Sequence, residues 1–123
     1  YRFFLHDEET PAVSPVVKRK DRKIIGYPEH EGILYEMLIP DSSIEFCMMY
    51  LSPAMASSDK LFCHSGEEVA CVLSGETTVL FDDASYILVE GDSIRIPAQT
   101  RHRWRNTSNE VTIVIFAVSP PTF

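Results

Sequence analysis

Short runs of β-branched and aromatic residues follow one another along most of the chain and are separated by turn residues. Neighbouring runs lie roughly 8 to 12 residues apart, which is the spacing of a β-sandwich or barrel. Turns such as 74–76 and 90–92 contain Ser, Asp and Gly, which bond to their own backbone or tolerate positive φ. The sequence therefore predicts an all-β fold. The predicted strands are 16–25, 33–39, 44–51, 60–64, 69–74, 77–81, 86–89, 93–96, 102–106 and 111–119.

The length of 123 residues suits a single domain with one core. Residues 1–15 combine an apolar patch, Phe3 to Leu5, with acidic residues and prolines, which predicts an arm or linker before a domain at 16–123. The composition, with 45% hydrophobic and 24% charged residues, excludes collagen-like, disordered and disulfide-dense classes. No apolar run reaches the roughly 18 residues of a membrane span, and no secretory signal is present.

Cysteine usage and charge indicate a cytoplasmic protein in which this domain itself does not bind nucleic acid. Cys47, Cys63 and Cys71 cannot all pair within the chain, and none lies in a Cys-x-x-Cys motif, so we expect reduced thiols. The net charge of -7 disfavours binding of this domain to phosphate backbones. The basic residues cluster at 18–23, whereas residues 24–92 hold 13 acids and one base. Because the chain begins at Tyr1, we also expect it to be part of a longer polypeptide.

Two strands carry an informative pattern of faces. Every second residue of 101–105 is Arg, which predicts His102, Trp104 and Asn106 on the inner face and three solvated guanidinium groups on the outer face. By contrast, 69–73 and 111–118 are apolar on both faces, which implies that something covers their outer side. We expect a homodimer, with the N-terminal arm as the alternative cover.

Two histidines and one glutamate form the candidate metal site. His64, Glu68 and His102 provide the two imidazoles and one carboxylate that suit a divalent metal with open positions. In an unbroken strand His64 and Glu68 would lie about 13 Å apart, too far to share a metal. We therefore expect a turn at 65–66, with Glu68 opening the next strand and Glu67 pointing away. The alternative is that each of the three is a buried polar group satisfied by hydrogen bonds.

The spacing of these residues resembles the two motifs of the cupin family. His64, Glu68 and Gly75 match the first motif, and Gly91, Pro97, His102 and Asn106 match the second. The resemblance covers about 60–106 and implies a double-stranded β-helix, or jelly-roll barrel. Gly75, Gly91 and Asn106 are expected to shape turns rather than to contact a ligand.

The chain departs from the cupin pattern at two places. Phe62 replaces a usual metal-binding His, and Gln99 replaces a usual Gly. Three ligands remain, as in some iron members of the family, and we expect Fe, Zn, Ni or Mn at His64, Glu68 and His102. We expect Phe62, Trp104 and Gln99 to line the ligand pocket, with core packing as the alternative for both aromatic residues.

The flanking residues resemble, more narrowly, the C-terminal sensor half of helix-turn-helix/cupin transcriptional regulators. The features are the basic run at 18–23, Gly66 to Glu68, the ending 102–106, and the terminal segment 119–123. The resemblance implies a domain that binds a small-molecule effector, without catalysis, and contacts DNA only through an upstream helix-turn-helix domain. The alternatives are a mononuclear metal enzyme (an oxygenase, epoxidase or isomerase) that uses the same three residues, and a structural dimerisation module without metal.

Overall fold

The computed structural model describes residues 14–26, 32–56 and 65–121. Within these ranges the chain forms strands joined by turns and bends, with one turn of 3-10 helix at Arg19–Asp21. No helix in this described part is long and apolar enough to cross a membrane. The strands are β1 (Lys23–Gly26), β2 (Ile33–Met37), β3 (Glu45–Leu51), β4 (Glu67–Ser74), β5 (Glu76–Leu80), β6 (Ser85–Val89), β7 (Ser93–Ile96), β8 (Arg103–Arg105) and β9 (Thr112–Ser119).

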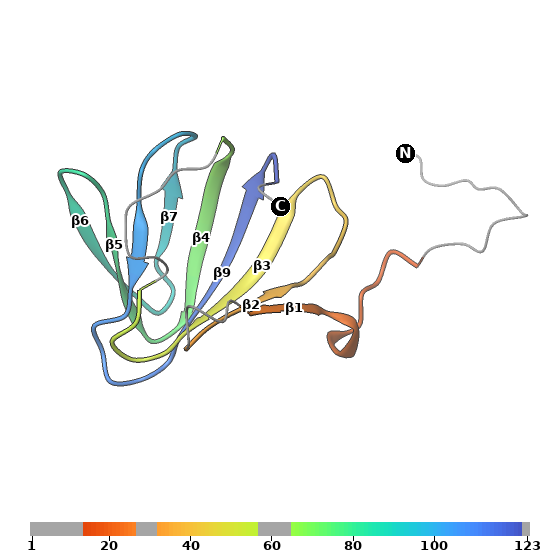
Figure 1. Ribbon diagram of the computed structural model, residues 1–123, viewed down its shortest axis with the longest axis horizontal. Coiled ribbons are helices and arrows are strands. Elements are labelled where there is room, and N and C mark those ends of the chain that lie inside the picture. The colour runs from red at the N-terminus through yellow and green to blue at the C-terminus, as the bar shows by residue number, and fades with distance from the viewer. Residues whose placement is uncertain (1–13, 27–31, 57–64, 122–123) are drawn as a thin grey trace, which may run out of the picture.

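The strands form two antiparallel sheets (Figure 1). The larger sheet has the order β1-β2-β3-β9-β4-β7, and the smaller has the order β6-β5-β8. Strand β9, the last in the chain, lies between β3 and β4, while β8 crosses over to pair with β5. These crossovers are the connections of a jelly roll, so the predicted all-β jelly-roll barrel is confirmed.

The core lies between the inner faces of the two sheets and follows the period-2 alternation of the strands. On β3 the side chains of Cys47, Met49 and Leu51 are buried, whereas the residues between them are only half-buried. Strand β9 alternates in the same way. Because successive side chains point to opposite faces, one apolar residue in two is enough to build the core. The buried apolar residues are Ile33, Cys47, Met49, Leu51, Ala70, Val72, Val79, Leu88, Ile96, Trp104, Val114, Phe116 and Val118.

Most predicted strands differ from the observed ones only at their ends. The first predicted strand, 16–25, is wrong over residues 16–22. Residues 16–22 are not a strand: the Asp21 amide donates to the Lys18 carbonyl, and the Arg22 amide donates to the Arg19 carbonyl. Five basic residues within 18–23 leave no apolar alternation that a sheet could bury. The strand therefore begins only at Lys23. The strand predicted at 60–64 lies outside the described residues.

Asn106 closes one end of the core, as the sequence predicted for a turn residue. Its Nδ2 donates to the carbonyl oxygens of Leu51 at 2.8 Å and Glu110 at 2.7 Å. Its Oδ1 accepts hydrogen bonds from the backbone amide and the hydroxyl of Ser108. Asn106 thus ties the end of β3 to the loop that leads into β9.

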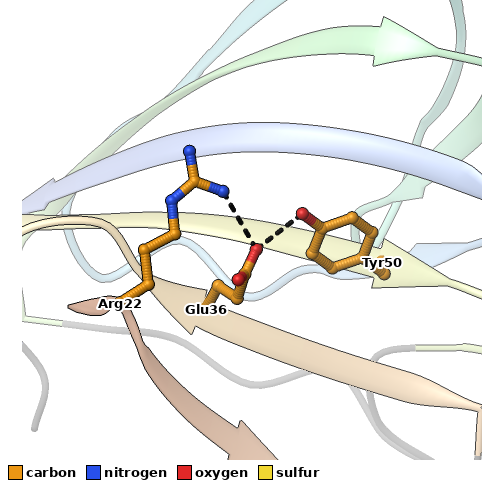
Figure 2. Close-up of polar contacts among 3 residues, drawn as sticks. All are labelled: Arg22, Glu36 and Tyr50. Carbon is orange, nitrogen blue, oxygen red and sulfur yellow. Dashed lines mark hydrogen bonds and ion pairs between the residues drawn. The ribbon is translucent and has the colours of Figure 1, made fainter. Parts of the chain in front are cut away.

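A polar cluster of Arg22, Glu36 and Tyr50 holds β1, β2 and β3 together on the outer face of the larger sheet (Figure 2). The Tyr50 hydroxyl donates to Glu36 Oε1 at 2.6 Å, and the Arg22 guanidinium donates to the same oxygen at 3.2 Å. Burial, together with the hydrogen bond to Glu36 and its charge, raises the pKa of Tyr50, while Arg22 and Arg19 oppose the shift. The cluster anchors the segment through which the chain enters the domain.

Gly75 and Gly91 both lie in turns and have similar positive φ angles, but the space around them differs. Their φ angles are +88° and +91°, which confirms their predicted role in turns. A Cβ on Gly75 would lie 2.9 Å from Thr112 Oγ1 and 3.0 Å from the Val111 carbonyl oxygen, whereas a Cβ on Gly91 meets nothing within 4 Å.

We expect Gly91→Ala to lose about 1 to 2 kcal/mol of unfolding free energy through left-handed strain alone. Gly75→Ala should lose clearly more in urea unfolding. Equal losses in the two variants would contradict close packing at Gly75.

Candidate functional site

Glu68 reaches the inner face because the chain bends immediately before β4. The bend at 65–66 lies against the C-terminal segment, where a Cβ on Gly66 would come within 2.6 Å of the Pro120 carbonyl oxygen. From this bend Glu67 points outward and is exposed, while the next residue, Glu68, points inward and is buried. The predicted bend and the predicted orientation of both carboxylates are confirmed.

His102 comes from the opposite sheet, one residue before β8. Its neighbours confirm the predicted alternation, because Trp104 and Asn106 are also buried while Arg101 and Arg105 are exposed. The His102 Nδ1 lies 2.9 Å from the Thr100 carbonyl oxygen, so this nitrogen carries the proton and donates it. The ring is thereby oriented with Nε2 towards the interior.

The two predicted site residues meet inside the domain. His102 Nε2 lies 3.3 Å from Glu68 Oε1, and the side chains are only 1% and 4% exposed. Burial, the largest influence, lowers the pKa of His102, but the hydrogen bond to Glu68, the hydrogen bond to the Thr100 carbonyl and the charge of Glu68 together outweigh it. The net effect raises the pKa of His102 above its usual 6.5. The pair therefore favours the protonated imidazole, whose positive charge faces the Glu68 carboxylate.

The donor chemistry of this pair fits a divalent metal as well as a proton. A metal-ligating imidazole commonly donates its other nitrogen to a carbonyl oxygen, as His102 does to Thr100. With Nδ1 protonated, a neutral ring presents the Nε2 lone pair to Glu68, and the two can then share a metal ion. Among the described residues no third His, Cys, Asp or Glu joins them into a ligand set. The predicted third ligand, His64, lies outside the described residues.

Trp104 and Gln99, two of the predicted ligand-binding residues, differ in burial. Trp104 is buried and points inward from β8. Gln99 is exposed in the loop between β7 and β8, with φ of +62°. This left-handed conformation explains why the cupin pattern has a Gly there, since Gly adopts it without strain. Phe62 lies outside the described residues.

Glu45 and Cys47 are inward-facing residues that the sequence prediction missed. Glu45 is buried and pairs in register with Val118, which on its other side pairs with Glu68. The two carboxylates therefore flank β9 on one inner face. Burial, with a smaller contribution from the charge of Glu45, raises the pKa of Cys47 to about 12, so its thiol stays protonated. The sequence gives no signal for either placement, because residues 46–51 are apolar or aromatic at every position and a charged residue such as Glu45 is expected outside.

The chain is similar to a known protein family and to a transcriptional regulator. The family model described as Cupin domain matches residues 48–119. The HTH-type transcriptional regulator PuuR of Escherichia coli (strain K12) is 30% identical over 124 residues, which cover 98% of this chain and 65% of the regulator. The chain therefore spans about two thirds of the length of that relative.

Solved structures also resemble the fold. An RmlC-like cupin from Shewanella frigidimarina NCIMB 400 has a TM-score of 0.74 at 19% identity, covering 89% of this chain and 94% of its own. The cupin domain of an XRE family transcriptional regulator from Enterobacter cloacae has a TM-score of 0.66 at 19% identity, covering 74% of this chain and 99% of its own. The resemblances predicted from the two motifs and from their flanks are confirmed.

The protonation of His102 can be tested in metal-free protein. In nuclear magnetic resonance spectra its ring should titrate above 6.5, and Glu68→Gln should lower the midpoint by removing the negative charge. Because the folded-state pKa is raised, the resulting stability is complete below about pH 6.5 and is lost as the pH rises through the folded-state pKa. Urea unfolding should therefore show parent stability falling over that range, and Glu68→Gln should show less of this fall. A midpoint at or below 6.5 in the parent would contradict the pairing.

Proposed function

The chain belongs to the cupin domain family, and from that premise we propose that it is the effector-sensing domain of a cytoplasmic transcriptional regulator. The supporting observation is the 30% identity to a helix-turn-helix regulator over nearly the whole chain. In this proposal DNA is contacted by an upstream helix-turn-helix domain outside this chain. The net charge of -7 is consistent with a domain that leaves DNA contact to another part of the protein.

The proposed effector site is the interior around Glu68 and His102. A divalent metal would be held by these two side chains together with His64, and it would supply a Lewis acid that anchors a donor atom of the effector. Trp104, Phe62 and Gln99 remain the proposed ligand contacts. The buried position of the pair supports a binding role, because a charged group in a dry interior interacts strongly with what enters beside it.

Effector binding would change the regulator by favouring one arrangement of its domains. A ligand shifts such an equilibrium only by its difference in affinity between the two states. Glu68 lies on β4 of the larger sheet, whereas His102 precedes β8 of the smaller sheet. A metal ion or molecule that contacts both side chains would therefore link the two sheets, which supports a sensing role for this position.

We further propose that the sensor is a homodimer formed through the outer face of the larger sheet. This outer apolar face carries a shallow groove of about 430 Å³ between β3, β9, β4 and β7. Val69 is 47% exposed there, an unusual exposure for a central strand of a sheet. A second copy placed about a two-fold axis would cover the same groove on both subunits. The outward residues of the groove are Phe46, Val69, Cys71, Ser93, Arg95, Ile115 and Ala117.

The effector site is tested by thermal stability and metal content in the same variants. Untagged protein is loaded with Fe(II), Zn(II), Ni(II) or Mn(II), and is then mixed with amines, sulfur compounds and organic acids. We expect one metal and one compound class to raise the melting temperature without turnover, because ligands that bind only the folded state stabilise it. His102→Ala should lose both effects, and His30→Ala, at a position with no proposed role, should keep them. Turnover of a compound would favour the metalloenzyme instead, and equal metal content in His102→Ala and the parent would contradict the site.

The dimer is tested by light scattering at micromolar concentration. We expect the parent to have twice the mass of the chain, and Val69→Asp to be monomeric because a buried, unpaired carboxylate opposes association. Ile87→Asp is the matched control, since Ile87 is 67% exposed on β6, outside the proposed interface. A monomeric parent, or equal dissociation of both variants, would refute this interface.

A further inference from the structure

A second hollow lies outside the core, where the edges of the two sheets part. Strand β6 is the edge of the smaller sheet and β7 is the edge of the larger one. Near the turn that joins β5 to β6 and the loop that follows β7, the edges enclose a cleft of about 500 Å³. Figure 1 shows this turn and this loop at the same end of the domain. The lining residues of this side cleft are Phe81, Asp82, Asp83, Ala84, Tyr86, Ile94, Arg95, Pro97, Thr100 and Arg101, so neither Glu68 nor His102 contributes.

The walls of the side cleft are apolar and partly aromatic. Phe81 and Tyr86 contact each other edge to face, with ring centroids 5.7 Å apart and planes at 77°. Ile94 and Pro97 come from β7 and the loop that follows it. More than half of Tyr86 is exposed, so much of its surface is available to a bound molecule. Such walls favour a ligand with a flat or branched apolar group.

The rim of the side cleft carries two charges of each sign. Asp82 and Asp83 lie on the turn between β5 and β6, while Arg95 lies on β7 and Arg101 lies before β8. Asp82 and Arg101 form an ion pair of 3.0 Å, and both side chains are more than half exposed. An exposed pair of this kind stabilises a fold only weakly, because water screens both charges. Its members can therefore exchange partners with a ligand at little cost.

From this combination we propose that the side cleft binds a small zwitterion with an apolar side chain, the chemistry of an apolar α-amino acid. The ligand carboxylate faces Arg95 and Arg101, and its ammonium group faces Asp82 and Asp83. The apolar group lies against Tyr86. The rim carries two aspartates and two arginines. A ligand with one charge complements only the pair of opposite sign and is repelled by the other pair. A zwitterion complements both pairs. The assignment is independent of the proposed effector site in the core, but Ile94 and Arg95 also line the groove of the outer apolar face.

The experiment compares three probes that share one phenyl group: L-phenylalanine, phenylacetate and phenethylamine. Each is titrated into the full chain, and affinity is followed by calorimetry and by amide shifts in nuclear magnetic resonance spectra. We expect L-phenylalanine to bind several-fold more tightly than either analogue, because each analogue lacks one of the two charged contacts. The shifts should be concentrated at 81–86 and 94–101. No binding, or equal affinity for an analogue and L-phenylalanine, overturns the proposal.

Variants separate this cleft from the core site. Tyr86→Ala should weaken L-phenylalanine binding about tenfold, while Ile87→Ala, at the next position on β6 and also exposed, should leave it unchanged. Arg95→Gln should remove the preference over phenethylamine, and Asp83→Asn the preference over phenylacetate. His102→Ala should have no effect. Loss of binding in His102→Ala with retention in Tyr86→Ala would place the amino acid in the core and overturn the side cleft, while leaving the proposed sensor function intact.

Discussion

Strand β9 is paired on both sides along nearly its whole length, and the rest of the structure depends on this pairing. It joins β3, from the first half of the chain, to β4, from the middle, and so makes one sheet of two separate segments. Its inward residues alternate without interruption from Thr112 to Val118. Because a shift of one residue would turn this whole set to the outer face, burial holds the register of both neighbours. Glu45 and Glu68 are thereby set on the same inner face.

The buried pair follows from the way the two sheets close on one another. Glu68 belongs to the sheet that β9 organises, and His102 belongs to the segment that crosses to the other sheet. Desolvation disfavours a charge on either group taken alone, yet the Thr100 carbonyl fixes the imidazole so that the carboxylate faces its second nitrogen. The raised pKa of His102 shows that this position favours a proton, and a metal ion held there is our proposal. Such a site is suited to sensing, because its occupancy changes the charge between the sheets.

The outer surface offers two further sites of different character. The outer apolar face lies over the central strands and carries a shallow apolar groove, which supports the proposal that another subunit covers it. The side cleft lies instead where the sheet edges part, and it combines aromatic walls with balanced charges. The outer apolar face suits a large flat partner, and the side cleft suits a small molecule.

The sequence by itself determined the features that depend on neighbouring residues. Strand positions, the turns at Gly75 and Gly91, and the inward direction of His102 follow from period-2 alternation and turn chemistry, which act within a few residues. The inward direction of Glu68 was expected only from its place in the candidate metal site, because the strand after it is apolar on both faces. The sequence prediction of a strand failed at 16–22, where a run of charged residues has no apolar face that a sheet could bury. Only the tertiary structure decided the 3.3 Å approach of His102 to Glu68, the direction of the His102 pKa shift and the side cleft. Each of these requires segments far apart in the chain to meet, and no local pattern specifies the distance at which they do.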